Sequence, residues 1–349
     1  MHERLALEEY SRGVLIKDIS FVEGGVLIRG QTGNPFFGYW NIQTGQFGHE
    51  TLEPVKFERI LGFSNDGRFL ILQKQGNRVQ VWDRVIGKVA ATFEHPTGQP
   101  PSHISNDGKT IVTSEGYKKL AVWDIPTGER HCKLKTGDGH CHLAPTGDFV
   151  VAGVVATVHD AHTGRKICSL PVDSSFATIS PDGRSFVHAY HNRAKLFDLE
   201  TGEKRESLVA PFELINGTVS PDNRRIAVGG CFQGVRVWDI PSEDIVATWD
   251  VPERYSRYLA FNADSSLLVS ASDAGVVRLW DVAGNRELAC LVLLNEIEWV
   301  TITPEGDFLG SNNASKYARW QMDGKKVDFD QYAKQFHSPK RVAASLKVG

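Results

Sequence analysis

The sequence lacks a long apolar run and a strong excess of either charge. No stretch of about 18 consecutive apolar residues occurs, which predicts the absence of a transmembrane helix. The opening residues, MHERLALEEYSRG, carry scattered charges in place of the apolar stretch of a secretory signal. With 39 Lys and Arg against 42 Asp and Glu, the chain lacks the basic surface that generic nucleic-acid binding requires. We therefore expect a cytoplasmic protein without a membrane partner, and nucleic acid is disfavoured as a partner.

Cysteine is scarce and irregularly spaced. The five cysteines are an odd number, which favours reduced thiols over a disulfide framework. The sequence also lacks the Gly-x-x-x-x-Gly-Lys-Ser/Thr, Gly-x-Gly-x-x-Gly, His-Glu-x-x-His and Gly-x-Ser-x-Gly motifs. We therefore expect no enzymatic activity, no cofactor and no small-molecule substrate.

The chain does contain a repeat with a period near 40 residues. An aromatic residue followed by a polar one ends a short apolar segment at intervals of 42, 41, 36, 38, 41, 42 and 40 residues. One of these pairs, His159-Asp160, is degenerate. This period is typical of four-stranded propeller blades. The pairs are Trp40-Asn41, Trp82-Asp83, Trp123-Asp124, His159-Asp160, Phe197-Asp198, Trp238-Asp239, Trp280-Asp281 and Trp320-Gln321.

Each interval repeats the same two turns. A turn follows the aromatic–polar pair, as in Asp124-Ile-Pro-Thr-Gly128, and its glycine supplies a positive φ. A second turn, such as Ser180-Pro-Asp-Gly183, comes about 20 residues later, with the composition that hairpins demand. Between turns, segments such as Val277-Arg-Leu-Trp280 alternate apolar and polar residues. The pattern predicts four short strands in each period, with the large ring buried between blades.

The stretch Ser270-Ala-Ser-Asp-Ala-Gly-Val-Val-Arg-Leu-Trp-Asp281 resembles the second half of a WD repeat. The resemblance covers roughly residues 13–324 and implies a β-propeller that serves as a rigid platform for other macromolecules. Members of that family place a Gly-His pair before the innermost strand, and Gly139-His140 is the nearest match here. Because most repeats of this chain lack the pair, we expect its blades to depend more on packing than on the buried network that the pair joins.

We expect an all-β fold, a single β-propeller with a short helical C-terminal tail. Eight aromatic–polar pairs favour eight blades, and seven stays open because family members usually have seven. The expected division is an N-terminal extension over 1–12, the propeller over 13–324 and the tail over 325–349.

The pattern changes after Trp320. Aromatic residues at Phe329, Tyr332 and Phe336 lie on one face of a helix. Ser338 and Pro339 then provide an N-cap and a first helical residue for a second helix. From Phe308 onward, eight Lys and Arg face three Asp and Glu. The residues predicted to contact a partner are Lys325, Lys326, Tyr332, Phe336, Lys340 and Arg341.

The segment from Glu298 to Pro339 also carries a resemblance. Glu298-Trp-Val-Thr-Ile-Thr-Pro-Glu-Gly306, with Lys316-Tyr-Ala-Arg-Trp320, is similar to the segment that closes WD-repeat regions of bacterial proteins, several of them joined to caspase-like peptidases. It implies a bacterial origin and a protease-linked signalling or defence setting. The alternative is that both helices only cover the last blade and seal a sheet edge.

Histidine and cysteine residues, which are common metal ligands, cluster in the stretch HCKLKTGDGHCHLAP that begins at His131. Cys132, His140, Cys141 and His142 are weak candidates for metal ligands. Strand alternation places His140 and His142 on one face and Cys141 on the other, so the four groups do not converge on a tetrahedral site. Packing is therefore the default interpretation. We expect the histidines His159, His162, His188 and His191 to be surface residues near turns.

Three functions compete. The first is a non-enzymatic interaction scaffold or regulatory subunit, with a protease or effector partner in a bacterial pathway. The second is an enzyme that uses the central channel, which requires carboxylates or histidines with perturbed pKa values at the axis. The third is a nucleic-acid-associated propeller. We favour the first.

Overall fold

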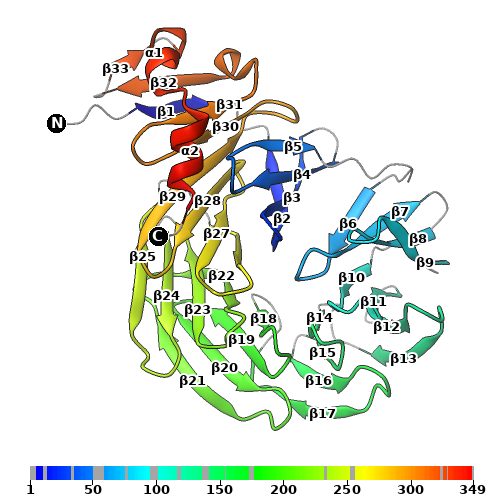
Figure 1. Ribbon diagram of the computed structural model, residues 1–349. Coiled ribbons are helices and arrows are strands. Elements are labelled where there is room, and N and C mark those ends of the chain that lie inside the picture. Colours follow the sequence, from blue (N-terminus) through cyan, green and yellow to red (C-terminus); the bar gives the residue numbers. More distant parts are fainter. Residues whose placement is uncertain are drawn as a thin grey trace. The chain divides into compact units, whose positions relative to one another are not determined.

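In the computed structural model, the regular secondary structure of the described residues is almost entirely short antiparallel strands (Figure 1). None of the described helices is long and apolar enough to cross a membrane. The structure describes residues 5–10, 14–32, 35–49, 59–74, 78–94, 101–115, 119–135, 141–153, 155–172, 177–231, 234–251, 256–322, 325–327 and 329–347.

Consecutive strands pair with one another in four-stranded sheets of uniform order, as the repeat predicts. The first sheet contains β2 (Leu15–Val22), β3 (Gly25–Gln31), β4 (Pro35–Asn41) and β5 (Phe47–His49). The second contains β6 (Arg59–Phe63), β7 (Phe69–Lys74), β8 (Arg78–Asp83) and β9 (Lys88–Glu94). The third contains β10 (Pro101–Ile104), β11 (Thr110–Ser114), β12 (Lys119–Asp124) and β13 (Arg130–Lys135).

The next sheets repeat this order. The fourth contains β14 (Cys141–Leu143), β15 (Phe149–Ala152), β16 (Thr157–Asp160) and β17 (Lys166–Ser169). The fifth contains β18 (Ala177–Ile179), β19 (Ser185–Tyr190), β20 (Arg193–Asp198) and β21 (Lys204–Val209). The sixth contains β22 (Leu214–Val219), β23 (Arg225–Gly230), β24 (Val235–Asp239) and β25 (Ile245–Trp249). The seventh begins with β26 (Tyr258–Phe261), β27 (Leu267–Ala271), β28 (Val276–Asp281) and β29 (Arg286–Leu293).

The preferred count of eight blades is wrong: the described strands form seven. The strands expected for an eighth unit divide between two sheets. Strands β30 (Trp299–Ile302) and β31 (Phe308–Gly310) extend the seventh sheet, because β30 pairs with the free edge of β29. Strand β32 (Ala318–Met322), which holds the last aromatic pair, lies instead between β1 (Leu5–Tyr10) and β33 (Lys325–Val327).

A tight hairpin explains why β30 stays on the seventh sheet. The Asn295 side-chain oxygen accepts hydrogen bonds from the backbone N–H groups of Ile297 and Glu298, at 2.8 and 2.9 Å. The chain therefore reverses directly after β29 and has no length in which to travel to a new sheet. Behind the hairpin, the carboxylate of Glu298 accepts hydrogen bonds from Ser311 and Asn313. These bonds hold the pKa of Glu298 below its ordinary value, although burial opposes them.

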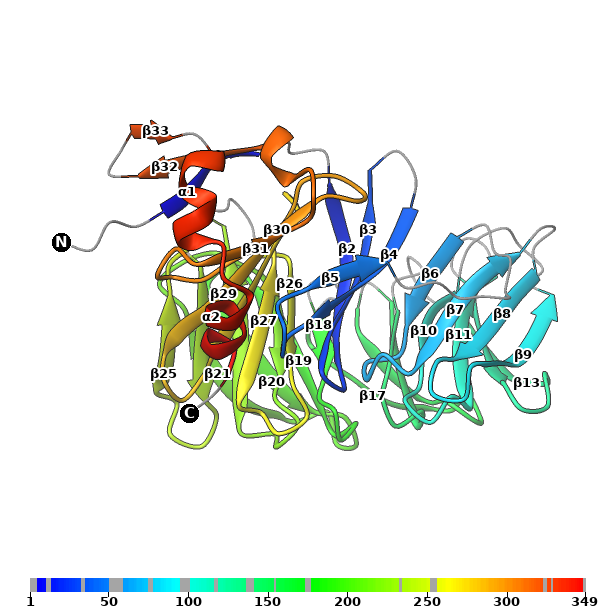
Figure 2. The ribbon, with the colours of Figure 1, turned by 45° about the horizontal axis from the view of Figure 1, so that its top comes forward.

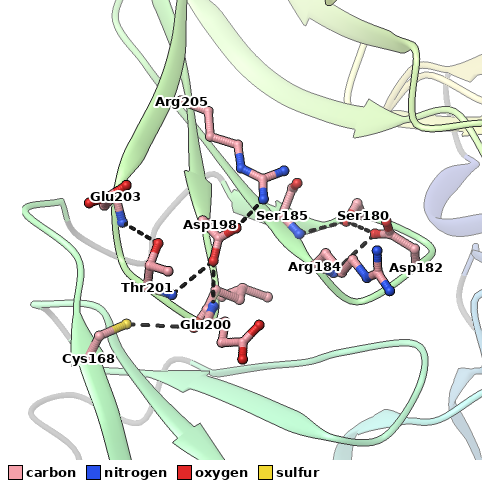
Figure 3. Close-up of polar contacts among 11 residues, drawn as sticks. Cys168, Ser180, Asp182, Arg184, Ser185, Asp198, Glu200, Thr201, Glu203 and Arg205 are labelled. Carbon is pink, nitrogen blue, oxygen red and sulfur yellow. Dashed lines mark hydrogen bonds and ion pairs between the residues drawn. The ribbon is translucent and has the colours of Figure 1, made fainter.

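Both predicted turns are present and are closed by their own side chains (Figure 3). After the aromatic–polar pair of the fifth sheet, Asp198 accepts hydrogen bonds from the backbone N–H groups of Glu200 and Thr201, at 2.9 and 2.8 Å. In the other turn, the Ser180 hydroxyl donates to Asp182 at 2.5 Å and accepts from Ser185 N at 2.8 Å. The glycines that the sequence places in these turns have positive φ, for example 72° at both Gly128 and Gly183.

The chain divides into two compact units. The first comprises Met1–Thr51, Phe232–Arg236 and Val246–Gly349, and the second comprises Leu52–Cys231 and Val237–Ile245. In the second unit, the first strand of each sheet contacts the first strand of the next, through β6, β10, β14, β18 and β22. In the first unit, β2 of the first sheet contacts β26 of the seventh.

Large side chains fill the spaces between neighbouring sheets, as the alternation predicts. In the first unit, Trp40 is fully buried and shares a core with Leu279 and Leu291 of the seventh sheet. Trp280 is 2% exposed and stacks on Trp249, with the ring centroids 4.8 Å apart. Burial of such rings is the main source of stabilisation between these sheets.

Two helices end the chain, as the sequence predicts. Helix α1 is Phe329–Phe336 and helix α2 is Pro339–Ser345. The Ser338 hydroxyl caps α2 by accepting a hydrogen bond from Arg341 N at 3.3 Å. Helix α2 contacts β29 and β31 (Figure 2), and Val342 and Leu346 are buried in the core of the first unit. A short 3-10 helix, Ala314–Lys316, precedes β32.

Candidate functional site

The His/Cys cluster spreads over two strands of neighbouring sheets. Cys132 lies on β13, whereas Cys141 and His142 lie on β14, and His140 lies outside the described residues. Cys141 is buried in an apolar core, and the Cys132 thiol donates to the carbonyl of Ala161 at 3.5 Å. Burial, assisted by the nearby charge of Asp160, raises the pKa of the Cys132 thiol. A thiol with a raised pKa is a poor nucleophile and a poor metal ligand at neutral pH.

His142 faces another histidine and not the cysteines. The ring centroids of His142 and His103 lie 5.6 Å apart. His103 occupies the position on β10 that His142 occupies on β14, so the repeat itself brings the two rings together. Burial lowers the pKa of His103 to about 3, and the neighbouring His142 contributes to this shift. Sequence reasoning missed this pair, which alignment of the repeats would have revealed.

The three candidate ligands that the structure describes, Cys132, Cys141 and His142, do not converge on one site. Within the described part of the chain, no group of three or more His, Cys, Asp or Glu side chains is placed to hold a metal ion. All five cysteines are free thiols in the structure.

Three of the four other histidines lie where they were expected, and one does not. His162 and His191 are exposed, and His159 is half-buried, with one ring nitrogen 3.2 Å from the carbonyl oxygen of Gly164. His188 was expected at the surface but is only 4% exposed. The expectation was wrong because His188 lies inside strand β19, not in the turn that follows it.

Asp18 on β2 is a carboxyl group of the described residues with a strongly shifted pKa. Burial raises its pKa to about 6, while Arg29 on the adjacent strand β3 opposes the shift from 3.6 Å. The side chain nevertheless retains 35% exposure, so water still reaches the carboxylate. The arrangement is a cross-strand ion pair.

The predicted partner-binding residues of the tail differ in accessibility. Lys340 is exposed, whereas Phe336 is buried against the seventh sheet. Arg341 is held by Asp307, with 2.6 Å between the guanidinium and the carboxylate, and also donates to the carbonyl of Gln335. The side chains of Lys325, Lys326 and Tyr332 lie outside the described residues, although Lys325 and Lys326 belong to β33 and Tyr332 to α1.

Comparison with known proteins agrees with this architecture. Residues 255–281, which include β26 to β28, match the model of the WD domain, G-beta repeat. Together with the strand order, this match supports a WD-repeat β-propeller.

Several curated proteins are similar to the chain at low identity. The serine-threonine kinase receptor-associated protein of Dictyostelium discoideum is 25% identical over 213 residues, which are 58% of this chain and 72% of that protein. Pre-mRNA-processing factor 19 homolog 2 of Arabidopsis thaliana is 22% identical over 68% of this chain. Nuclear distribution protein PAC1 of Arthroderma otae is 21% identical over 83% of this chain. The matches span only 44% and 54% of the latter two proteins.

Proposed function

We propose that the chain is a non-enzymatic protein-interaction scaffold or regulatory subunit. The observation that carries the proposal is the repetition of one sheet construction, with its turns closed by their own side chains. Such sheets form stiff supports, and the loops at their ends are free to vary in sequence and to contact partners. The repeat match supports the same class of function, since WD-repeat propellers typically bind other proteins.

The names of the similar proteins point the same way. One is named for its association with a serine-threonine kinase receptor, and another for a role in pre-mRNA processing. An association with another protein, as the first name states, is what a scaffold requires.

A more specific partner is also proposed, on narrower grounds. The resemblance of residues 298–339 to the end of bacterial WD-repeat regions supports a caspase-like protease or effector as partner, in a bacterial cytoplasmic signalling or defence pathway. The organisms of the three similar proteins named above are eukaryotic, so this part of the proposal depends on the C-terminal segment alone. We also propose that the chain consists of an N-terminal extension over 1–12, the propeller over 13–324 and the helical tail over 325–349.

A charge reversal on the tail tests the contact. The variant combines Lys325→Glu, Lys326→Glu and Lys340→Glu. Its matched control reverses three exposed lysines outside the tail, Lys119→Glu, Lys135→Glu and Lys166→Glu. The partner is first identified by crosslinking in the source cells and then purified. We expect the triple variant to bind this partner about tenfold more weakly and the control to bind as the wild type does. Equal binding by all three proteins would contradict the tail as the contact, and the lack of any specific partner would contradict the scaffold.

A further inference from the structure

The turn between β8 and β9 carries two large aliphatic side chains at its tip. Val85 is 74% exposed and Ile86 is 58% exposed. On the strand that follows, Val89 is 38% exposed, and every residue from 85 to 90 is exposed. Apart from Gly87 and Lys88 this run is apolar, so the turn and the start of β9 expose three large aliphatic side chains to water.

The equivalent turns of other sheets show that this exposure is not required by the fold. There, the residue after the aromatic–polar pair is apolar and buried, as with Ile125, Leu199 and Val282, each at most 2% exposed. In this turn Arg84 takes that position. Its backbone N–H donates to Arg68 O at 3.0 Å, and the equivalent residues of the other sheets make the corresponding bond. The aliphatic side chains are therefore moved from the core side of the turn to its tip.

The backbone of the turn is nevertheless held as firmly as in its equivalents. Asp83 accepts hydrogen bonds from the N–H groups of Val85 and Ile86, at 2.9 and 3.3 Å. Its other oxygen is bound by the Arg68 guanidinium at 2.8 Å. This ion pair and the two backbone N–H groups hold the pKa of Asp83 below its ordinary value, although burial opposes them. The exposed aliphatic groups thus lie on a preorganised turn, which lowers the entropic cost of binding to them.

Strand β9 is an edge strand without charges over four consecutive residues. It is the last strand in the order β6-β7-β8-β9, and Val89-Ala-Ala-Thr92 carries no ionisable group. The outer strand of the next sheet, β13, instead carries Arg130, Lys133 and Lys135. Charged side chains protect sheet edges from pairing with another strand, so the stretch of β9 between Lys88 and Glu94 lacks the protection that β13 has.

The rim of this surface is basic. Lys88 is exposed at the start of β9, and the Arg84 guanidinium before the turn donates to the carbonyl of Gly67 at 3.3 Å. Arg78 lies at the other end of the strand pair, where its partner on β9 is Glu94. The only acidic side chain among residues 78–92 is Asp83, which is buried and ion-paired with Arg68. A binding segment with acidic residues next to its aliphatic ones is therefore favoured.

We propose that the outer edge of the second sheet, formed by β9 and the Val85–Ile86 turn, docks an extended segment of a partner protein in which aliphatic and acidic residues alternate. The segment adds to β9 as a further strand, its aliphatic side chains cover Val85, Ile86 and Val89, and its carboxylates face Lys88. This inference rests on the proposed scaffold function and names its docking surface. A protein segment fits better than an anionic membrane, because a sheet edge presents backbone donors and acceptors that only another backbone satisfies in register.

A peptide selection tests the proposal and does not require the partner to be identified first. A displayed library of random ten-residue peptides is selected on the full chain alone, and the selected peptides are then tested for binding to the double variant Val85→Ser, Ile86→Thr. The control variant is Glu200→Ser, which changes the exposed tip of an equivalent turn. Circular dichroism verifies that both variants are folded.

The expected peptides alternate aliphatic residues with Asp or Glu and bind the double variant at least about tenfold more weakly than the wild type, with the control within about twofold. Replacing their acidic residues with Lys lowers affinity by about tenfold as well. Selected peptides that bind the double variant equally, or that show no acidic enrichment, would overturn the proposal. So would wild-type binding to phosphatidylserine vesicles that the double variant loses, since the surface would then belong to a membrane.

The outcome is separable from that of the scaffold hypothesis. If a partner identified in cells binds the double variant as well as the wild type, the docking surface is wrong while the scaffold function stands. If no partner exists, the scaffold function itself fails, whatever the peptides do.

Discussion

Replacing Trp280 with alanine tests the packing of the seventh sheet. The ring is 2% exposed, stacks on Trp249 at 4.8 Å with 17° between the planes, and donates through Nε1 to the Ser270 hydroxyl at 2.8 Å. Removing a buried aromatic ring costs about 3–5 kcal/mol, because the site relaxes only in part around the cavity. Of this cost, about 0.5–1.5 kcal/mol comes from the stacking of the ring on Trp249, in addition to the burial of its apolar area. We therefore expect Trp280→Ala to lower the free energy of unfolding by about 3–5 kcal/mol.

The measurement is urea unfolding followed by far-ultraviolet circular dichroism, which does not depend on the deleted fluorophore. Trp280→Phe keeps most of the ring but loses the bond to Ser270, and we expect a loss of about 1–2 kcal/mol. Tyr317→Ala, at a side chain that is 44% exposed, serves as the control and should cost less than about 0.5 kcal/mol. A loss below about 1 kcal/mol for Trp280→Ala would refute the assignment of this ring to the core.

Three further predictions follow from particular contacts. His103 stays neutral in the folded chain down to its pKa of about 3, whereas the unfolded chain takes up a proton near pH 6.5, so stability falls as the pH drops from 6.5 towards 3. Because the His103 ring is partly exposed, we expect the free energy of unfolding to fall by about 1–2 kcal/mol between pH 6.5 and pH 4.5. In His103→Gln, the urea midpoint should not show this decrease. Val342→Asp should destabilise the first unit by about 3 kcal/mol or more because it buries a charge, whereas Lys340→Glu on the exposed side of the same helix should leave the midpoint unchanged. Because its pKa is raised, Cys132 should react with a disulfide reagent at pH 7 more slowly than a free thiol, and reaction at the free-thiol rate would contradict its burial.

Local pattern was sufficient to predict most of the fold. The aromatic–polar pairs lie at the ends of β4, β8, β12, β16, β20, β24 and β28, the third strand of each four-stranded arrangement. These features depend on residues close in sequence, such as a glycine at positive φ or an aspartate that closes its own turn. Helix α2 was predictable for the same reason, since its cap residue Ser338 lies next to it.

The sequence pattern could not predict which strands pair when they lie far apart in the chain. The strands near Trp299 and Trp320 have the composition of a blade, but β30 pairs with β29, and β32 pairs with β1 from the other end of the chain. Periodicity states which segments are strands and does not state which edge each one joins. Phe336 illustrates the same limit: its spacing predicts a helix, and only the packing shows that the ring is covered.

Candidate sites were harder to predict than strands. The cluster at 132–142 was a candidate because it contains several histidines and cysteines. In the structure, His142 instead contacts the ring of His103, which lies one repeat earlier in the sequence. The aliphatic turn at Val85 and Ile86 is unremarkable in composition. It becomes visible only when its exposure is compared with the equivalent turns.

The scaffold hypothesis is tested most directly by hydrogen exchange of the chain with and without its purified partner. The account predicts slower exchange of the β9 amides, Lys88 to Thr92, in the complex and unchanged exchange on β13 of the next sheet. Slower exchange confined to other surfaces would contradict the docking edge, and a chain whose exchange no partner alters would contradict the scaffold function.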